Sequence, residues 1–399
     1  MKRTTNDLRK AEPGDDSIDR SPASRETHPW TDHRPWLSGQ RRGIVAAFVR
    51  TLLWIASQGY GVAIRIRNRR YDRRPQVATR CGVPVISVGN LTTGGTGKTP
   101  VVRFLARRLR DRGIRVSIVS RGYGGGQAGI NDEALELEAC LPDVPHVQDP
   151  DRVAAARVAV EELDTELILM DDGFQHRRLH RDLDVLIVDA SCPFGFGYLL
   201  PRGLLREPLG SLRRADLVIV SRARAVDDET LRRLRAALRR IAPGMPIVTS
   251  EHAPAGLLKH PGEREPLRSL DGASVALVSA IGNPDAFERT VRGCGANVVA
   301  RRDLPDHDPY SPETVRSLDG WLRTSARAAS MAVCTHKDLV KLRTDRLGGL
   351  PLRALQIELE ILSDEACLTS WIERASDLLN TSPSRQRESR EGRAGSGVA

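Results

Sequence analysis

The chain has few of the features that mark secreted, zinc-binding or single-stranded nucleic-acid-binding proteins. Its six cysteines form no C-x-x-C pair, which argues against a zinc or disulfide framework and indicates buried thiols in a reducing compartment. Aromatic residues make up only 4% of the sequence, so stacking platforms for single-stranded nucleic acid are poorly supplied. Lysine is also scarce, at six of the 61 basic residues, and an arginine bias over the whole chain indicates genome composition rather than a nucleic-acid surface. The net charge of +10 still makes an acidic partner worth considering.

Neither end of the chain has the composition of a folded segment. The first 40 residues are polar, charged and rich in Pro, Ser and Asp, without the apolar run that a signal peptide needs. We therefore predict a disordered extension over residues 1–42 and no secretion signal. Residues 381–399 have low complexity and predict a disordered tail.

Residues 92–99 read TTGGTGKT and match a phosphate-binding loop in all but the first position. The apolar run before the loop predicts a buried strand, and the helical spacing after it predicts a helix, which is the setting that a phosphate site needs. Lys98 is expected to reach the β- and γ-phosphates of ATP, and the Thr99 hydroxyl to bind Mg²⁺. The strict motif has Gly where this chain has Thr92. The residues that we assign to nucleotide binding are Thr92, Thr93, Gly94, Gly95, Thr96, Gly97, Lys98 and Thr99.

From residue 83 onward, short apolar runs alternate with helical patterns. The alternation predicts an α/β fold in which a P-loop NTPase-like parallel sheet is covered by helices on both faces. A polar, Pro-containing stretch at 251–270 predicts a linker between a P-loop core at 71–255 and a smaller α/β lobe at 271–380, with a two-substrate site in the cleft between them. The expected strands lie at 83–88, 115–119, 167–170, 184–188, 216–220, 274–279, 297–300, 330–334 and 354–360, and the helices of the second lobe at 284–293, 311–328 and 364–379.

An amphipathic helix is expected at residues 43–66, followed by the basic run RNRRYDRR. Its strongest apolar part covers about 13 residues, fewer than the roughly 20 that a membrane span requires. The wide apolar face and the flanking arginines favour a helix lying at a membrane surface, so 43–70 is assigned as a membrane-associating segment. The alternative is a helix that covers the soluble core.

Two carboxylates, Asp171 and Asp172, end the apolar run at 167–170. Ligands bind at the carboxyl ends of strands in such sheets, so both acids are predicted to face the loop of Lys98 and to hold Mg²⁺. The alternative is that they simply begin a loop. A kinase also needs a group that takes the hydroxyl proton. The candidates are Asp132, beside Glu133 in INDEA, and His307 in LPDHDPY, although an Asp-Glu pair in a loop is usually solvated and a His beside acids usually lies in a surface turn.

From about residue 43 to residue 375 the sequence resembles the tetraacyldisaccharide 4'-kinase (lipid A 4'-kinase) family. The blocks that carry the resemblance, in order, are ISVGNLTTGGTGKTP at 86–100, SRGYGG at 120–125, NDEA at 131–134, DDGFQHRRLHRDLDVLIVDA at 171–190, LPRGLLREPL at 200–209, IGNPDAF at 281–287, LPDHDPY at 304–310 and THKDLVKL at 335–342. The resemblance implies an ATP-dependent lipid kinase of lipid A biosynthesis. Such an enzyme transfers the γ-phosphate to the 4'-hydroxyl of a tetraacyldisaccharide 1-phosphate at the cytoplasmic face of the inner membrane.

Residue roles follow from the same resemblance. Lys98 is implied to act in catalysis and nucleotide binding, and Thr99, Asp171 and Asp172 in holding Mg²⁺. Asp132 falls on the Asp of the family's G-D-E-P block, the base for the acceptor hydroxyl, and His307 falls on the His that works with it. Such a dyad is reasonable because an imidazole can hold a nearby carboxylate in position and raise the proton affinity of that carboxylate.

Three departures and one consequence accompany the resemblance. The family's G-D-E-P is Asn131-Asp132-Glu133-Ala134 here, its T-E-K-D has His336 in place of Glu, and the N-terminal extension has no counterpart. The resemblance implies that Thr in the first position of the loop, Thr92 here, is usual for this family. A substrate with four acyl chains, each buried CH₂ contributing about 0.8 kcal/mol, requires work at a bilayer surface, which favours membrane docking for the 43–66 helix. Arg202 or Arg206 could pair with the substrate's phosphate.

Two rival functions fit the sequence less well than a lipid kinase does. A partitioning-type P-loop ATPase switch uses a loop with a signature lysine at the position that Thr93 occupies here, which counts against this alternative. A nucleic-acid-dependent ATPase would need a recognition motif, and the sequence contains none that we recognise. We therefore expect a lipid A disaccharide 1-phosphate substrate, no nucleic acid and no obligate protein partner.

Overall fold

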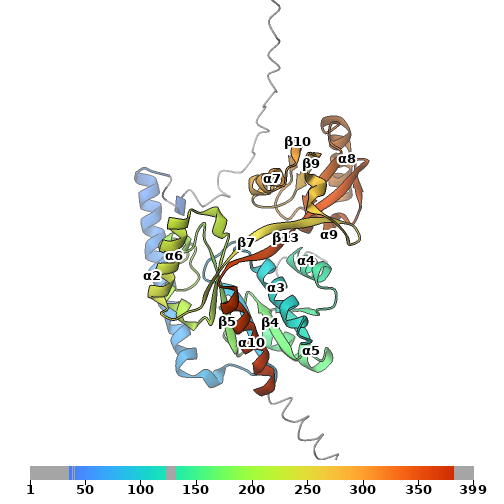
Figure 1. Cartoon of the computed structure of the whole chain (residues 1–399). Coiled ribbons are helices and arrows are strands. Elements are labelled where there is room, and N and C mark those ends of the chain that lie inside the picture. The colour runs from blue at the N-terminus through green and yellow to red at the C-terminus, as the bar shows by residue number, and fades with distance from the viewer. Residues whose placement is uncertain (1–35, 38, 40, 123–131, 382–399) are drawn as a thin grey trace, which may run out of the picture. The chain divides into compact units, whose positions relative to one another are not determined.

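A computed structural model describes residues 36, 37, 39, 41–122 and 132–381, and nearly all of the expected extension and tail lies outside these ranges. The chain divides into two compact units, residues 1–50 and 51–399. The second unit holds a 13-stranded, mostly parallel sheet covered by helices, so the predicted α/β fold with an N-terminal helix is confirmed (Figure 1). Each of the nine expected strands is present.

The strands are β1 Val85–Asn90, β2 Val116–Ser120, β3 His146–Gln148, β4 Leu167–Asp171, β5 Leu183–Asp189, β6 Leu217–Ser221, β7 Ile247–Lys259, β8 Glu263–Glu265, β9 Ser274–Ser279, β10 Asn297–Asp303, β11 Met331–Thr335, β12 Arg346–Leu347 and β13 Leu350–Ser363. The longer helices are α2 Ile44–Arg73, α3 Lys98–Arg110, α4 Asp132–Cys140, α5 Arg152–Glu162, α6 Asp228–Ile241, α7 Pro284–Gly293, α8 Pro312–Ser325, α9 His336–Leu342 and α10 Glu365–Thr381.

The first half of the sheet has the order β3-β2-β4-β1-β5-β6-β7, and all of these neighbours are parallel. Side chains alternate between its two faces, as strand geometry requires. In β5, Val185 and Ile187 enter the core beneath α3, α4 and α10, whereas Leu186 and Val188 enter the core beneath α6. Because β1 lies between β4 and β5, the carboxyl ends of these three strands meet at one edge of the sheet.

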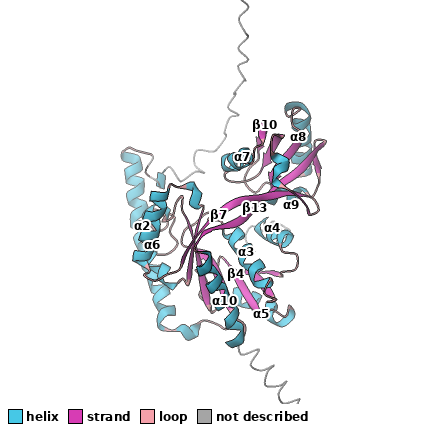
Figure 2. Cartoon of the chain, viewed as in Figure 1, coloured by secondary structure: helices cyan, strands magenta, loops and turns pink. Residues whose placement is uncertain are grey.

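The stretch that the sequence marked as a linker is part of the sheet. Residues 251–259 belong to β7, which pairs with the antiparallel β13, and this pair joins the two halves into one continuous sheet (Figure 2). Residues 251–254 of β7 are half-buried, so polar side chains are tolerated there. Pro254 lies beside a register shift in the β7–β13 pairing, a place where a strand accommodates proline. A polar, Pro-containing strand of this kind resembles a linker in sequence.

The C-terminal helix α10 packs against the first half of the sheet, although its position in the sequence grouped it with the second lobe. Its buried face includes Leu368, Trp371, Ile372 and Ala375, which share a core with α3 and with the central strands. Trp371 is 4% exposed. A Trp→Ala change at such a site typically costs about 3–5 kcal/mol. The helix therefore closes the core on which the loop of Lys98 rests.

Helix α2 is longer than expected and presents two different faces. Large apolar side chains lie exposed along one face at helical spacing: Ile44 (91% exposed), Phe48 (63%), Leu52 (50%), Ile55 (56%), Val62 (52%) and Ile66 (64%). About 180° away around the helix, Ser57, Ile64 and Asn68 are buried. In the described part of the chain, no helix is long and apolar enough to cross a membrane.

Candidate functional site

The phosphate-binding loop connects β1 to α3, as the sequence predicted. Lys98 and Thr99 lie in the first turn of α3, where backbone N–H groups have no partner within the helix and favour an anion. Gly97 is the residue before this turn and has a left-handed backbone conformation, with φ of 83°. A Cβ atom at Gly97 would lie 2.1 Å from Cε1 of His252 in β7, so glycine is required here for two separate reasons.

Thr92 occupies the position at which the strict loop motif has Gly. Its backbone forms an isolated antiparallel bridge with Leu205, and the Thr93 N–H donates to the Leu204 carbonyl at 2.8 Å. An extended, paired backbone suits a β-branched residue. The departure at Thr92 therefore reflects pairing with the 200–209 loop and leaves the glycines nearer α3 in place.

Side chains from the neighbouring strands hold the rest of the loop. Asn90 Nδ2 donates to the Thr96 hydroxyl at 2.8 Å, and the Ser221 hydroxyl donates to the Thr96 carbonyl at 2.9 Å. Arg222 Nη2 donates to the Gly95 carbonyl at 2.9 Å and also pairs with Asp189 at the end of β5. These contacts fix the backbone before any phosphate binds, which reduces the entropy lost on binding.

Asp172 lies at the centre of the charged groups beside the loop. Lys98 Nζ is 3.6 Å from Asp172 Oδ1, and Arg206 Nη1 donates to both Asp172 oxygens at 3.0 and 2.9 Å. Burial alone would raise the pKa of Asp172, but the adjacent Lys98 and Arg206 hold it below its ordinary value. The Asp172 N–H donates to Asp171 Oδ1 at 2.8 Å, so the two acids form one compact turn. The structure thus brings Lys98, Asp171 and Asp172 together, as predicted.

These groups line a cavity of about 280 Å³. Four of the side chains that line it have no role predicted from the sequence: Ser120, Arg121, His146 and Arg152. The Ser120 hydroxyl is 2.7 Å from His146 Nε2, and burial lowers the pKa of His146 to about 4, so this imidazole is neutral near pH 7. The described residues that line the cavity are Gly94, Gly95, Lys98, Ser120, Arg121, Gly122, Ala134, Leu137, His146, Arg152, Asp171, Asp172 and Arg206.

The two residues assigned to the acceptor hydroxyl are placed less directly. Asp132 is the first residue of α4, a helix whose Ala134 and Leu137 line the cavity, but the Asp132 side chain lies outside the described part of the structure. His307 lies in the turn after β10, with φ of 64° and a side chain that is 63% exposed. Its Nε2 is 3.8 Å from Asp306 Oδ1, and it does not belong to the cavity lining. An Asp132–His307 pair therefore stays a prediction.

A family model described as tetraacyldisaccharide-1-P 4'-kinase matches residues 49–377. The chain belongs to this family. It is similar to the tetraacyldisaccharide 4'-kinase of Anaeromyxobacter dehalogenans strain 2CP-C, with 41% identity over 343 residues that cover 81% of this chain and 90% of the relative. The corresponding protein of Geobacter sulfurreducens is 36% identical, over 86% of this chain and 98% of its own length. A crystal structure of LpxK from Aquifex aeolicus in complex with ATP superimposes with a TM-score of 0.66 at 30% identity, covering 82% of this chain and 99% of that chain.

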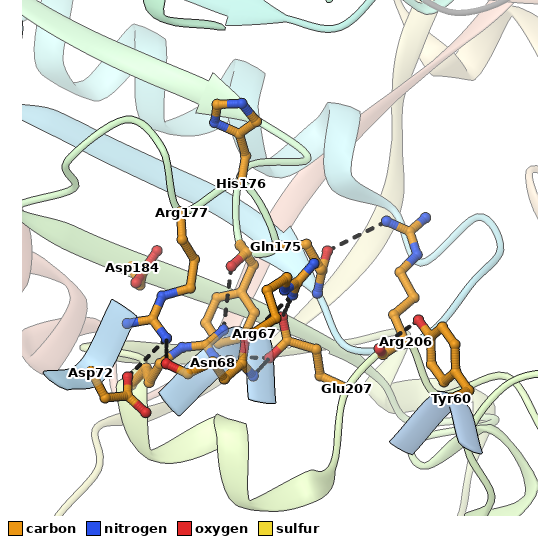
Figure 3. A network of polar contacts seen from close by, with 12 residues as sticks. Tyr60, Arg67, Asn68, Asp72, Gln175, His176, Arg177, Asp184, Arg206 and Glu207 are labelled. Atoms are coloured by element: carbon orange, nitrogen blue, oxygen red, sulfur yellow. Dashed lines mark hydrogen bonds and ion pairs between the residues drawn. The ribbon is translucent and has the colours of Figure 1, made fainter. Parts of the chain in front are cut away.

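A buried network ties this kinase family member's phosphate site to α2 (Figure 3). Arg206 and Glu207 are consecutive, and Figure 3 shows their side chains on different partners. Glu207, which is completely buried, accepts from Arg67 Nη2 at 2.9 Å, Asn68 Nδ2 at 2.8 Å and Arg214 Nη1 at 2.8 Å. The Tyr60 hydroxyl donates to the Arg206 carbonyl at 2.9 Å.

The sequence predicts Arg206 only as one possible partner for the substrate's phosphate and predicts no role for Glu207. The other arginine considered for that role, Arg202, stacks on the Tyr198 ring at 4.3 Å. The sequence shows the adjacent Arg-Glu pair in the LPRGLLREPL block, but it does not show which charges the two side chains meet.

Proposed function

We propose that this chain transfers the γ-phosphate of ATP to the 4'-hydroxyl of a tetraacyldisaccharide 1-phosphate, a lipid A precursor. The observation that carries the proposal is the meeting of Lys98, Asp172 and Arg206 at the phosphate-binding loop, in a chain of this family. A loop lysine beside a strand-end carboxylate is the arrangement that phosphoryl transfer from a nucleotide requires.

In this proposal the cations hold the phosphates of the nucleotide. The amides at the start of α3 bind phosphate oxygens, and Lys98 and Arg206 offset the charge that builds up on the γ-phosphoryl group as its bond to the β-phosphate breaks. Asp172 keeps both cations aimed into the cavity, because its carboxylate contacts each of them. Ala134 and Leu137 line the same cavity and limit access of water, which strengthens these interactions.

A Mg²⁺ ion fits the oxygen donors at this site. The Thr99 hydroxyl and the carboxylates of Asp171 and Asp172 are hard ligands, and Mg²⁺ is usually held by one or two carboxylates together with phosphates and water. Within the described ranges, no three His, Cys, Asp or Glu side chains are grouped as a metal site. The ion would offset negative charge on the phosphates.

Asp132 is the proposed base for the acceptor. The 4'-oxygen attacks the γ-phosphorus, its proton passes to the Asp132 carboxylate, and ADP leaves with the electrons of the broken phosphorus–oxygen bond. His307 is proposed to position Asp132 once the acceptor is bound. Support for Asp132 comes from its place at the start of α4, whose next turns line the cavity.

We further propose that the chain works at the cytoplasmic face of the inner membrane, bound through α2. The exposed apolar stripe of α2 lies opposite the helix face that is buried, and arginines follow it at positions 65, 69, 70 and 73. A helix with these properties binds at an anionic lipid surface, apolar side chains in the acyl region and arginines near the headgroups.

The test is a lipid phosphorylation assay. Purified protein in detergent micelles with Mg-ATP should add one phosphate to tetraacyldisaccharide 1-phosphate. Lys98→Ala should lower the transfer rate by on the order of 10²–10³ or more, since one donor to the developing charge is lost. Lys259→Ala is the matched control, because Lys259 pairs with exposed Glu263 at 3.1 Å on the surface, and it should retain normal turnover.

Two results would contradict the proposal. The first is ADP release at the same rate with and without the lipid acceptor, which favours the ATPase switch. The second is equal activity of the Lys98→Ala and Lys259→Ala proteins, which removes the loop from the chemistry. Asp132→Asn tests the base separately: it should slow turnover while leaving ATP affinity unchanged, and normal turnover would exclude Asp132 from proton transfer.

A further inference from the structure

A second cluster of reactive side chains, apart from the phosphate site, is formed by residues of α3, α4 and α9. Cys140, at the end of α4, receives a hydrogen bond from Arg103 Nη1 at 3.1 Å, and its sulfur is 3.4 Å from Nδ1 of His336. His336 is the first residue of α9 and occupies the position where the family motif T-E-K-D has Glu. The known reaction gives this pair no role.

The surroundings of the cluster favour separated charges. Glu136 Oε1 is 3.8 Å from His336 Nδ1, and the charged groups that face Cys140 and His336 come from α3 (Arg103 and Arg107), α4 (Glu136) and α9 (Lys337). Arg107 is itself paired with Glu358 at 2.9 Å, and Glu138 lines the adjoining cavity, so Arg103 is the cation that contacts the Cys140 sulfur directly. A thiolate beside an imidazolium is the form in which each ionised atom has a partner of opposite charge.

The pKa shifts agree with that geometry. Burial alone would raise the pKa of the Cys140 thiol, but its contacts with His336 and Arg103 hold it below the ordinary value. Burial alone would lower the pKa of His336, but its contacts with Cys140 and Glu136 raise it to about 9. By contrast, burial raises the pKa of the thiols of Cys81, Cys294, Cys334 and Cys367.

The cluster opens into its own cavity of about 570 Å³. Cys140 and His336 form part of the wall, together with Arg264 and Arg343. His336 is 5% exposed, and its second ring nitrogen, Nε2, is buried without a hydrogen-bond partner. The two arginines in the wall can bind a small polar reagent or the anion that it releases, and the unpaired, buried Nε2 leaves the His336 ring without a fixed partner on that side.

We propose that Cys140 and His336 form a thiolate–imidazolium site that reacts with small peroxides from this cavity. The Cys140 sulfur attacks one oxygen of hydrogen peroxide, the S–O bond forms and the O–O bond breaks. The leaving hydroxide takes a proton from His336 and departs as water. Sulfur loses two electrons to the peroxide, and the product is a sulfenic acid that a thiol can reduce.

Helix α4 couples this site to the phosphate cavity. Ala134 and Leu137 line the phosphate cavity, whereas Leu135, Ala139 and Cys140 line the second one, so α4 is a wall shared by both. Oxidation adds an oxygen atom between α4 and α9 and removes the charge pair that holds the two helices. We therefore expect the oxidised protein to transfer phosphate more slowly, an expectation that rests on the proposed kinase function.

The first experiment measures thiol reactivity and does not depend on kinase activity. Full-length protein is treated with iodoacetamide at pH 6.5 and at pH 9.5, and all six cysteines are followed by peptide mass mapping. Cys140 should react about tenfold or more faster than the other cysteines at pH 6.5. His336→Gln should slow Cys140 labelling about tenfold or more at pH 6.5, with a much smaller effect at pH 9.5, where any accessible thiol ionises.

Buried Cys334 reports on folding in the same samples, because a misfolded variant would expose it and raise its labelling. His336→Glu, which restores the residue of the family motif, should slow Cys140 at pH 6.5 in the same way. An equal effect of His336→Gln at both pH values would assign His336 a packing role and overturn the proposal. So would Cys140 labelling at the same rate as the other cysteines.

The second experiment uses hydrogen peroxide. A sulfenic acid trapped with dimedone should map to Cys140 in the wild-type protein, and the lipid phosphorylation rate should fall and return on treatment with dithiothreitol. Cys140→Ser should resist the loss of activity. Undiminished turnover with Cys140 fully oxidised would overturn the coupling through α4, and absence of the dimedone adduct would overturn the reactive site itself.

Discussion

Glu207→Gln tests whether the buried network beside the phosphate site stabilises the fold. The change keeps the size of the side chain and removes one charge from a carboxylate that is completely buried and accepts from Arg67, Asn68 and Arg214. Breaking a fully buried ion pair typically costs about 3–5 kcal/mol. The Arg67 side chain is 38% exposed, so water partly compensates its loss, and we expect a decrease of about 2–4 kcal/mol in the free energy of unfolding.

The cost of Glu207→Gln should depend on pH, and the direction of the Glu207 pKa shift decides whether this cost grows or shrinks in acid. Burial alone would raise the pKa of Glu207, but Arg214 and the other donors hold it below the ordinary value of 4.5. A carboxylate with a depressed pKa in the folded state contributes stability that is fully present above 4.5 and is lost as the pH falls through its folded value. The difference between wild type and Glu207→Gln should therefore stay constant from pH 8 to about pH 5 and shrink at lower pH.

Urea unfolding followed by circular dichroism at pH 7 and pH 4 measures both effects. The matched control is Glu360→Gln, because Glu360 forms an exposed ion pair with Arg224, both side chains being more than 40% exposed. That control should cost less than about 1 kcal/mol. Equal costs for the two substitutions, or a Glu207→Gln cost that does not change with pH, would refute the reasoning.

Two further predictions concern the loop and α2. Gly97→Ala should lower the free energy of unfolding by about 1–3 kcal/mol and weaken ATP binding in calorimetry, because the position has a left-handed backbone and the new Cβ would clash with His252. Gly95→Ala is the control, because a Cβ there meets open space and should leave stability unchanged. Equal stabilities of the two variants would contradict this prediction. Leu52→Asp with Ile55→Asp should reduce sedimentation with anionic vesicles about tenfold or more, while Val299→Asp, an exposed valine on β10, should have no effect; unchanged sedimentation would place docking elsewhere.

Local patterns in the sequence predicted most of the architecture. Runs such as 167–170 and 216–220 are almost entirely apolar because their strands are buried on both faces, which is typical of parallel sheets. The phosphate loop was recognisable because its glycines, lysine and threonine lie within eight residues. Asp171 and Asp172 could be placed near Lys98 because β1 and β4 are adjacent and parallel, so their carboxyl ends meet.

What the sequence could not provide are pairings between distant segments. The role of β7 as a bridge depends on β13, about 100 residues later, and a half-buried strand lacks the alternation that marks an ordinary one. Thr92 looked like a departure from a motif because its partner, Leu205, lies on another loop. Arg206 and Glu207 gave no indication of which charges they meet, since Asp172 follows β4, Arg67 lies on α2 and Arg214 lies seven residues beyond Glu207. In each case the sequence identifies one residue of the contact but not the residue that it meets.

The contacts of α2 also decide how its function can be tested. Deleting residues 1–66 removes the exposed apolar stripe, but it also removes Tyr60, which bonds to the backbone of Arg206, and it frees the end of the helix that carries Arg67 and Asn68. Loss of activity after such a deletion would therefore mix membrane release with damage to the loop that positions Arg206 at Asp172. The Leu52 and Ile55 substitutions separate the two effects, because both side chains point away from the buried face and leave its hydrogen bonds intact. If the Leu52 and Ile55 variant loses vesicle binding but keeps normal turnover on substrate in detergent, α2 docks the enzyme without taking part in the chemistry.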